Sequence, residues 1–256
     1  MKLTFLGTAS GIPVLHRNHS ALLAEKKGTC VLLDAGEGVC QALLQRNVDP
    51  DSIEKVFISH THADHVGGVP MLLQMMYLQG RTKPISIYCS EDKVDWLIRM
   101  LHGLLIFREK WSFSFEVLPL PLAGDATLKD VDIRFFPNNH LANSRLLSTS
   151  HGFGASAYSF ILREGSENIV VSSDIESIHD ISDVCADATH LIIECTHISL
   201  EIIFRFAEEH KGLKTFITHI PPEVESVIES WKRKSESELQ SRITFAYDGL
   251  TIETEL

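Results

Sequence analysis

The chain has 256 residues, of which 44% are hydrophobic, and its formal net charge at pH 7 is −11. This length and apolar content suit one α/β domain with a sizeable core. No run of about 18 uncharged apolar residues occurs, which excludes a transmembrane helix, and the acidic charge disfavours a long polyanion such as RNA as the main partner.

The start of the chain does not resemble a signal peptide, because one Lys is followed by only a short apolar patch. The chain has an odd number of cysteines, five, and no CxxC pair, which is typical of a reducing compartment. We therefore expect a cytoplasmic protein with no membrane partner and with unpaired, buried thiols. The cysteines are Cys30, Cys40, Cys89, Cys185 and Cys195.

In the first half of the chain, apolar β-branched runs alternate with helical patterns. Pro70 falls in the first turn of the second predicted helix, a position that tolerates proline. The predicted strands are residues 2–6, 20–24, 29–33, 55–59, 85–89 and 113–118, and the predicted helices are residues 37–46, 69–78 and 92–105.

The second half repeats this plan. Asp248-Gly249, between two final β-like runs, predicts a tight hairpin turn, and the Gly- and Ser-rich stretch 148–156 predicts a mobile loop. Two mixed halves without a Pro- or Gly-rich linker predict an α/β (α+β) protein, in which two packed sheets carry helices outside. The predicted strands are residues 133–137, 158–162, 169–173, 190–194, 215–218, 242–247 and 251–255, and the predicted helices are residues 178–185, 200–210 and 223–233.

The strongest functional signal is a histidine-rich segment between an apolar strand and a helix. Its three imidazoles and one carboxylate lie in one loop, where the backbone can turn all four towards a common centre. His60 and His62 can hold one ion, and Asp64 and His65 can hold a second beside it. Mixed nitrogen and oxygen ligands suit Zn²⁺, with Mn²⁺ or Fe²⁺ as alternatives.

Such a site needs further ligands, and three candidates follow predicted strands. These residues are His140, Asp174 and His219. Because sites in α/β proteins gather at strand ends, we expect the three to join the histidine-rich segment. Taken singly, each could instead cap a helix or bond to a backbone group.

These motifs resemble the metallo-β-lactamase superfamily, in which an HxHxDH run is followed by isolated His, Asp and His residues at strand ends. The resemblance covers the whole chain and implies a four-layer αββα sandwich, in a single hydrolase domain of residues 1–256. The ribonuclease Z branch is resembled in Gly7-Thr8-Ala9-Ser10-Gly11-Ile12-Pro13, Arg17-Asn18-His19-Ser20, Asp34-Ala35-Gly36-Glu37-Gly38 and Gly68-Val69-Pro70.

The resemblance also implies how two zinc ions are held. Asp34 is similar to the family's aspartate that orients a ligand imidazole from behind, and a turn-forming role before Gly36 is the alternative. The first ion would take His60, His62 and His140, the second would take Asp64, His65 and His219, and Asp174 would bridge both.

Paired zinc ions would generate a metal-bound hydroxide near neutral pH, so no Ser or Cys nucleophile is required. Asp64 would hold and orient that hydroxide, while the ions neutralise charge in the transition state. His197 is the candidate general acid for the leaving group, and Glu194 would hold its ring and raise its pKa. A helix-capping role or a core role for His197 is the alternative.

The chain also departs from ribonuclease Z. Only 34 positions separate His140 from Asp174, too few for the long arm by which those enzymes grip tRNA. Ala63, Ser173 and Ile175 replace the usual residues of that branch. With the acidic charge, these departures favour a phosphodiesterase acting on a small or nucleotide-like phosphodiester.

Several other functions stay open. The same metals could serve a tRNA 3′-processing endonuclease (ribonuclease Z) acting on RNA, or a thioester, lactone or sulfate-ester hydrolase. A diiron redox protein is less favoured, because redox relatives favour Glu where His62 stands and commonly carry a flavin domain. A non-catalytic metal-binding protein is less favoured because the predicted ligand set is intact. The apolar stretch 71–78 fits a homodimer interface and core packing equally well.

Overall fold

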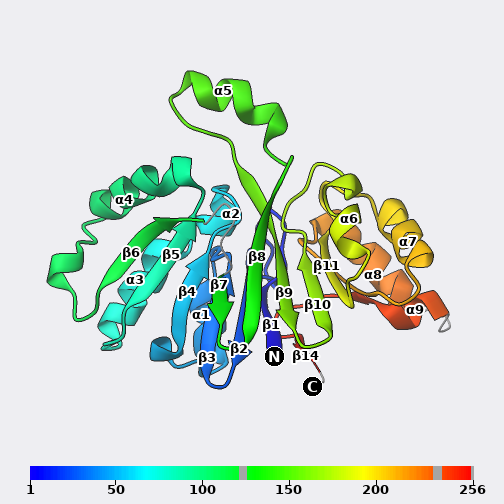
Figure 1. The fold of residues 1–256 in the computed structure, drawn as a ribbon, viewed down its shortest axis with the longest axis horizontal. Helices are drawn as coiled ribbons and strands as arrows, with labels where there is room; N and C mark the ends of the chain where they lie inside the picture. The colour runs from blue at the N-terminus through cyan, green and yellow to red at the C-terminus, as the bar shows by residue number, and fades with distance from the viewer. Residues whose placement is uncertain (121–125, 233–237, 255–256) are drawn as a thin grey trace.

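The computed structural model describes residues 1–120, 126–232 and 238–254. Two seven-stranded sheets pack face to face, and helices cover the outer face of each sheet (Figure 1). This arrangement confirms the predicted αββα sandwich. Within the described residues, no helix has both the length and the apolar character needed to cross a membrane.

The first sheet has the strand order β14-β1-β2-β3-β4-β5-β6. Neighbours from β14 to β3 are antiparallel and neighbours from β3 to β6 are parallel. The strands are β1 Lys2–Gly7, β2 Ala21–Lys26, β3 Thr29–Leu33, β4 Ile53–Phe57, β5 Ile85–Cys89, β6 Phe115–Pro119 and β14 Thr251–Glu253. The accompanying helices are α1 Val39–Gln45, α2 Ala63–Val66, α3 Val69–Leu78 and α4 Val94–Gly103.

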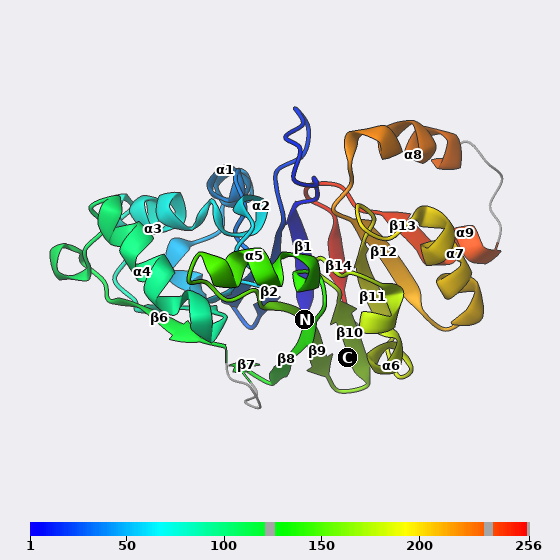
Figure 2. The same cartoon turned by 90° about the horizontal axis from the view of Figure 1, so that it is seen from above.

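The second sheet has the strand order β13-β12-β11-β10-β9-β8-β7 and is parallel only from β10 to β13. Its strands are β7 Ala126–Leu128, β8 Val131–Asn138, β9 Ala157–Glu164, β10 Glu167–Val171, β11 His190–Glu194, β12 Lys214–Thr218 and β13 Ile243–Phe245. Its helices are α5 Arg145–Ser150, α6 Ser182–Cys185, α7 Leu200–Glu209, α8 Glu225–Lys232 and α9 Glu238–Arg242. Helix α5 projects beyond both sheets (Figure 1), and from above it lies over the middle of the sandwich (Figure 2).

Strand β3 shows how the core forms three layers. Val31 and Leu33 point into the apolar cluster between the sheets, whereas Leu32 points into the cluster beneath α1, α3 and α4. A third apolar cluster fills the space between the second sheet and α6, α7 and α8. Side chains alternate along a strand, so a strand covered on both faces must be apolar throughout.

The predicted hairpin at Asp248-Gly249 is wrong. Strand β13 pairs with β12 in the second sheet, while β14 pairs with β1 in the first. The side chain of Asp248 accepts hydrogen bonds from Thr8 Oγ1 at 2.7 Å and from the backbone N–H of Asn18 at 2.6 Å. The turn therefore carries the chain from one sheet to the other, because each run finds a better partner strand elsewhere.

Smaller differences concern element ends. The helices predicted at 92–105 and 178–185 each begin as a 3₁₀ turn, Glu91–Lys93 and Ile178–Asp180, before α4 and α6. Part of the stretch predicted as a loop, 148–156, belongs to α5. The predicted ends at residues 233 and 255 lie outside the described residues. All five cysteines are free and buried, as predicted.

Residues 71–78, the stretch predicted to serve either a homodimer interface or the core, lie in helix α3 and have both buried and exposed side chains. Leu72, Leu73 and Met76 are buried, while Met71 and Leu78 are more than half exposed. Core packing therefore explains one face of α3, and the homodimer stays a prediction for the other.

A buried arginine holds the segments before β4 and β5. The Arg81 side chain is 1% exposed and donates to the carbonyl oxygens of Ile53, Lys83 and Pro84 at 2.7–2.8 Å, and to that of Pro50. The guanidinium thus supplies donors to carbonyl groups at the start of β4 and in the segments that lead into β4 and β5.

We expect Arg81→Met to lower the free energy of unfolding by about 3 kcal/mol, because several carbonyl groups would lose their donor. Urea unfolding followed by circular dichroism measures this change. Lys83→Met, at an exposed neighbouring position, is the control and should shift the value by less than about 0.5 kcal/mol. Equal shifts in the two variants would contradict the role of Arg81.

Candidate metal centre

Seven histidine and aspartate side chains meet at one edge of the sandwich. The histidine-rich segment follows β4 of the first sheet, whereas His140, Asp174 and His219 follow β8, β10 and β12 of the second. Most of these side chains are buried: His60 and His65 are each 1% exposed and Asp174 is 2% exposed. The structure thus brings together every residue predicted as a metal ligand.

The donor atoms form two groups. In each group, the donor atoms lie within 4.8 Å of one another. Asp174 belongs to the first group but also contacts the second, because its Oδ1 lies 3.2 Å from His65 Nε2 and its Oδ2 lies 3.4 Å from His219 Nε2. The first group is His60, His62, His140 and Asp174, and the second is Asp64, His65 and His219.

The hydrogen bonding and protonation of these donor atoms fit the binding of divalent metal ions. His65 Nε2 and Asp174 Oδ1 are buried and form no hydrogen bond with described residues, so an ion would satisfy them. Burial lowers the pKa of His60 and of His219, and it lowers the pKa of His140 to about 4. Neutral imidazole is the form that binds a metal. The cluster is therefore a metal-binding site.

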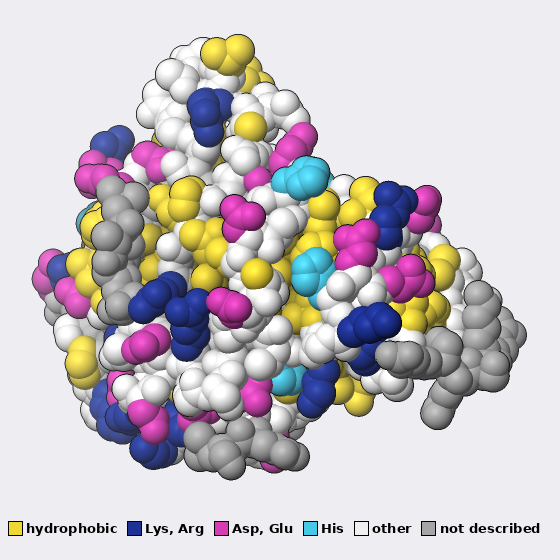
Figure 3. Space-filling model, turned by 45° about the vertical axis from the view of Figure 1, so that its right-hand side comes forward, with side chains coloured by type: hydrophobic (Ala, Val, Ile, Leu, Met, Phe, Trp, Pro, Cys, Tyr) yellow, Lys and Arg dark blue, Asp and Glu magenta, His cyan; other side chains and the backbone are white. Residues whose placement is uncertain are grey.

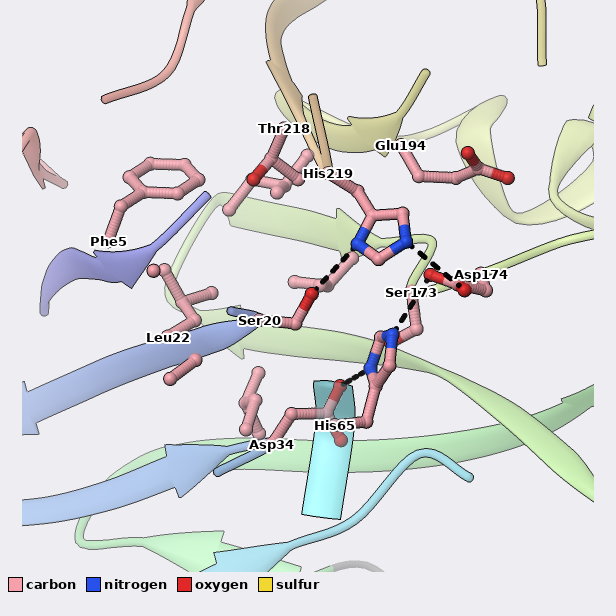
Figure 4. Close-up of a pocket in the computed structure, with 15 residues that line it drawn as sticks. Phe5, Ser20, Leu22, Asp34, His65, Ser173, Asp174, Glu194, Thr218 and His219 are labelled. Carbon is pink, nitrogen blue, oxygen red and sulfur yellow. Dashed lines mark hydrogen bonds and ion pairs between the residues drawn. The ribbon is translucent and has the colours of Figure 1, made fainter. Parts of the chain in front are cut away.

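Hydrogen bonds on the far side of the rings set the directions of the imidazoles. Asp34 Oδ2 lies 2.8 Å from His65 Nδ1, and Ser59 donates to Asp34 through both its backbone N–H and its hydroxyl. Ser20 Oγ lies 2.9 Å from His219 Nδ1 (Figure 4). Such contacts fix the tautomer and orientation of a ligand ring. Sequence reasoning anticipated Asp34 but missed both serines, which carry no spacing signal of their own.

Close backbone approach and left-handed turns shape the loops at this edge. A Cβ atom at Gly36 would lie 2.2 Å from the carbonyl oxygen of Asp64, so only glycine lets these loops touch. Asp34, Ser173 and His219 have φ values of 61°, 48° and 52°. This conformation costs a non-glycine residue about 1–2 kcal/mol. Ser173 therefore adopts a left-handed turn that glycine would adopt at lower cost.

His197 and Glu194 form a pair beside the cluster. Glu194, at the end of β11, places Oε1 3.0 Å from His197 Nδ1 and accepts the backbone N–H groups of Thr196 and His197 through Oε2. The hydrogen bond to Glu194 raises the pKa of His197. The His197 ring centroid lies 4.7 Å from that of His140, and Nδ1 lies 3.9 Å from Asp174 Oδ2.

The alternative roles for His197 do not agree with its surroundings. Ser199 caps α7, because its side chain accepts a hydrogen bond from the backbone N–H of Ile202. The side chain of His197 is 37% exposed, so it is not a core residue. The raised pKa of His197 contrasts with the lowered pKa values of His60, His140 and His219, and its role as general acid stays a prediction.

An apolar cavity of about 40 Å³ lies behind the second group of donors. Phe5 and Leu22 line it together with Asp34, His65 and His219 (Figure 4). The ligand side chains are therefore backed by hydrocarbon on this side, which strengthens electrostatic interactions within the site.

Helix α5 and its flanking residues, 139–156, stand beside the cluster and lie in the interval of the chain between β8 and Asp174. This short projection is tied down at both ends: Asn139 Nδ2 donates to Asp180 at 2.7 Å, and Lys93 Nζ lies 4.9 Å from the centre of the Phe153 ring. The structure places a short helical projection there, in agreement with the spacing argument.

Comparison with known proteins identifies relatives of this chain. The family model described as Anti-Pycsar protein Apyc1 matches residues 1–233. Ribonuclease Z of Methanococcus maripaludis (strain C5) is 42% identical over 102 residues, covering 40% of this chain and 32% of that protein. Ribonuclease Z of Bradyrhizobium diazoefficiens is 28% identical over 238 residues, or 77% of each chain. This chain thus spans about a third of the methanococcal relative.

Solved structures agree on the fold. The short form of human tRNase Z has a TM-score of 0.74 at 22% identity and covers 100% of both chains. The metallo-β-lactamase fold protein YhfI from Bacillus subtilis has a TM-score of 0.75 at 19% identity over 99% of both chains. A diphosphatase from the PhnP family has a TM-score of 0.74 at 19% identity, covering 100% of this chain and 98% of that one. The predicted metallo-β-lactamase fold and ribonuclease Z-like resemblance are confirmed.

We expect zinc-reconstituted protein to hold about two metal ions per chain and His62→Ala to hold about one, because the variant loses a donor from the first group only. Plasma emission spectrometry after gel filtration measures this content. His102→Ala, an exposed histidine on α4, should leave the content unchanged. Unaltered content in His62→Ala would contradict the assignment.

Proposed function

The chain belongs to the Anti-Pycsar protein Apyc1 family, and from this premise we propose that it is a phosphodiesterase that cleaves a small or nucleotide-like phosphodiester. It is a metal-dependent hydrolase with the metallo-β-lactamase fold. The observation that carries the proposal is the His197–Glu194 pair beside the metal-binding cluster. A diester of phosphate needs both charge neutralisation at its oxygens and a proton for its leaving group.

Two divalent ions fit the two groups of donors, with Zn²⁺ first and Mn²⁺ or Fe²⁺ as alternatives. His60, His62 and His140 would hold one ion, Asp64, His65 and His219 would hold the other, and Asp174 would contact both. When bound, such ions polarise phosphoryl oxygens and lower the pKa of water.

The chain's own side chains then have separate tasks. Asp64 is 14% exposed, so its carboxylate can reach a water molecule at the mouth and orient it for attack. His197 donates a proton from Nε2 to the leaving oxygen, since its Nδ1 is engaged by Glu194. The raised pKa of His197 keeps that proton in place near neutral pH.

Two kinds of relative support phosphate ester chemistry, because the similar proteins include ribonuclease Z enzymes and a diphosphatase. Action on tRNA is the second candidate and rests on the same ribonuclease Z relatives. Against it, residues 139–156 contain a single basic residue, Arg145, and the net charge is −11. Affinity for a nucleic acid comes largely from basic contacts to phosphates, so a small diester suits this surface better.

We expect zinc-loaded protein to hydrolyse bis(p-nitrophenyl) phosphate and a nucleoside 3′,5′-cyclic monophosphate. Its kcat/KM on these diesters should exceed that on p-nitrophenyl acetate, a lactone, a thioester and p-nitrophenyl sulfate by about 100-fold. Absorbance and chromatographic assays give the rates. Faster 3′ cleavage of a precursor tRNA, or faster turnover of any non-phosphate ester, would overturn the choice of substrate.

The proton-donor role of His197 predicts a dependence on the leaving group. His197→Asn should lower kcat about 100-fold for a diester with a nucleoside alcohol as leaving group. The loss should be only a few-fold for p-nitrophenolate, which leaves without a proton. His102→Asn is the control and should leave both rates unchanged. Equal losses on both substrates would indicate a structural role.

A further inference from the structure

A groove of about 420 Å³ opens beside the metal cluster, between the segment after Asp174 and helix α7. This volume falls in the range of small-ligand pockets. Its apolar residues are Ile178, Ile198, Ile202 and Phe206. Figure 3 shows this side of the molecule, where hydrophobic side chains lie next to histidines and are surrounded by both acidic and basic groups.

His197 belongs to both the groove and the metal-binding region. Its side chain lines the groove, and its Nδ1 lies 3.9 Å from Asp174 Oδ2. Glu194 holds Nδ1 from behind at 3.0 Å, so the ring keeps one orientation between the two spaces. A molecule in contact with the metal cluster would therefore meet the groove on the far side of His197.

The direction of the proposed reaction assigns a part of the substrate to this groove. A general acid must lie within hydrogen-bonding distance of the leaving oxygen. If His197 protonates that oxygen, the rest of the leaving group lies on the side of the imidazole ring that faces away from the metal cluster. The space on that side of His197 is the groove.

The walls of the groove select the chemistry of that group. Ile198 and Phe206 are 3% and 8% exposed and form an apolar floor, while Ile202 is 39% exposed at the edge. Arg205 is the basic residue among those lining the groove, and its guanidinium already pairs with Glu201 at 3.1 Å.

Acidic groups complete the walls. Glu176 and Glu209 are exposed and line the same groove, and Asn143 donates to Glu176 at 3.1 Å. An anionic group would meet two carboxylates and an arginine that is already paired, whereas an uncharged ring would cover the apolar floor.

We propose that this groove binds the leaving alcohol of the phosphodiester, and that this alcohol is uncharged and carries an apolar or aromatic ring. The inference rests on the proposed phosphodiesterase function and names the substrate class within it. A polynucleotide, whose leaving strand carries further phosphates, does not fit this groove.

Two diesters that differ by one carboxylate on the leaving group test the inference: methyl p-nitrophenyl phosphate and methyl 3-carboxy-4-nitrophenyl phosphate. Zinc-loaded wild-type protein should prefer the uncharged leaving group in kcat/KM. Ile202→Lys should shift the ratio about fivefold towards the carboxylated substrate, and Ile202→Glu about fivefold away from it, as expected for a partly exposed charge. The matched controls are Val227→Lys and Val227→Glu on α8, where Val227 is 40% exposed.

The outcomes distinguish a wrong assignment of the groove from a wrong assignment of the phosphodiesterase function. Metal content and melting temperature, measured for every variant, show that each variant is folded and loaded. Hydrolysis of both diesters, with a ratio that Ile202 variants move no more than Val227 variants, overturns the groove assignment and leaves the phosphodiesterase function standing. Hydrolysis of neither diester by loaded wild-type protein overturns both.

Discussion

The buried carboxylate of Asp174 imposes the constraint on which the rest of this site depends. It is 2% exposed, is surrounded by imidazoles from both donor groups, and has one oxygen without a hydrogen bond. Burying an unpaired charge costs far more than one polar contact returns, so such a group requires cations around it. The neighbouring histidines surround this carboxylate. Their rings are held in turn by Asp34 and by the hydroxyl of Ser20, and Asp34 is held by the hydroxyl of Ser59.

The histidines of this site differ in their pKa values. Burial lowers the pKa of His60, His140 and His219, while one hydrogen bond to Glu194 raises the pKa of His197, although its ring contacts that of His140. Neighbouring histidines can therefore carry opposite tasks, one group holding metal and the other carrying a proton. Which task a histidine carries depends on the residue that contacts the far side of its ring.

Much of this structure could be predicted from the sequence, and the failures have physical causes. Strand β3 and helix α3 were predicted to the residue, because their apolar patterns are set by burial on known faces. The Asp248-Gly249 turn was predicted wrongly, since a turn dipeptide specifies a local bend and not which strands pair. The ligand residues stood out by type and position at strand ends. Ser20 and Ser59 did not, because a single hydroxyl has no pattern before the fold brings it to a ring.

The predicted metal donors come from both sheets: the histidine-rich segment follows β4 of the first sheet, and His140, Asp174 and His219 follow strands of the second. Any ion that these donors share acts as a cross-link between the two halves of the sandwich. Binding energy at the centre is then also energy that holds the halves in register. We therefore expect the folding of this chain to depend on the supply of metal, and a chelator to act on its architecture as well as on its chemistry.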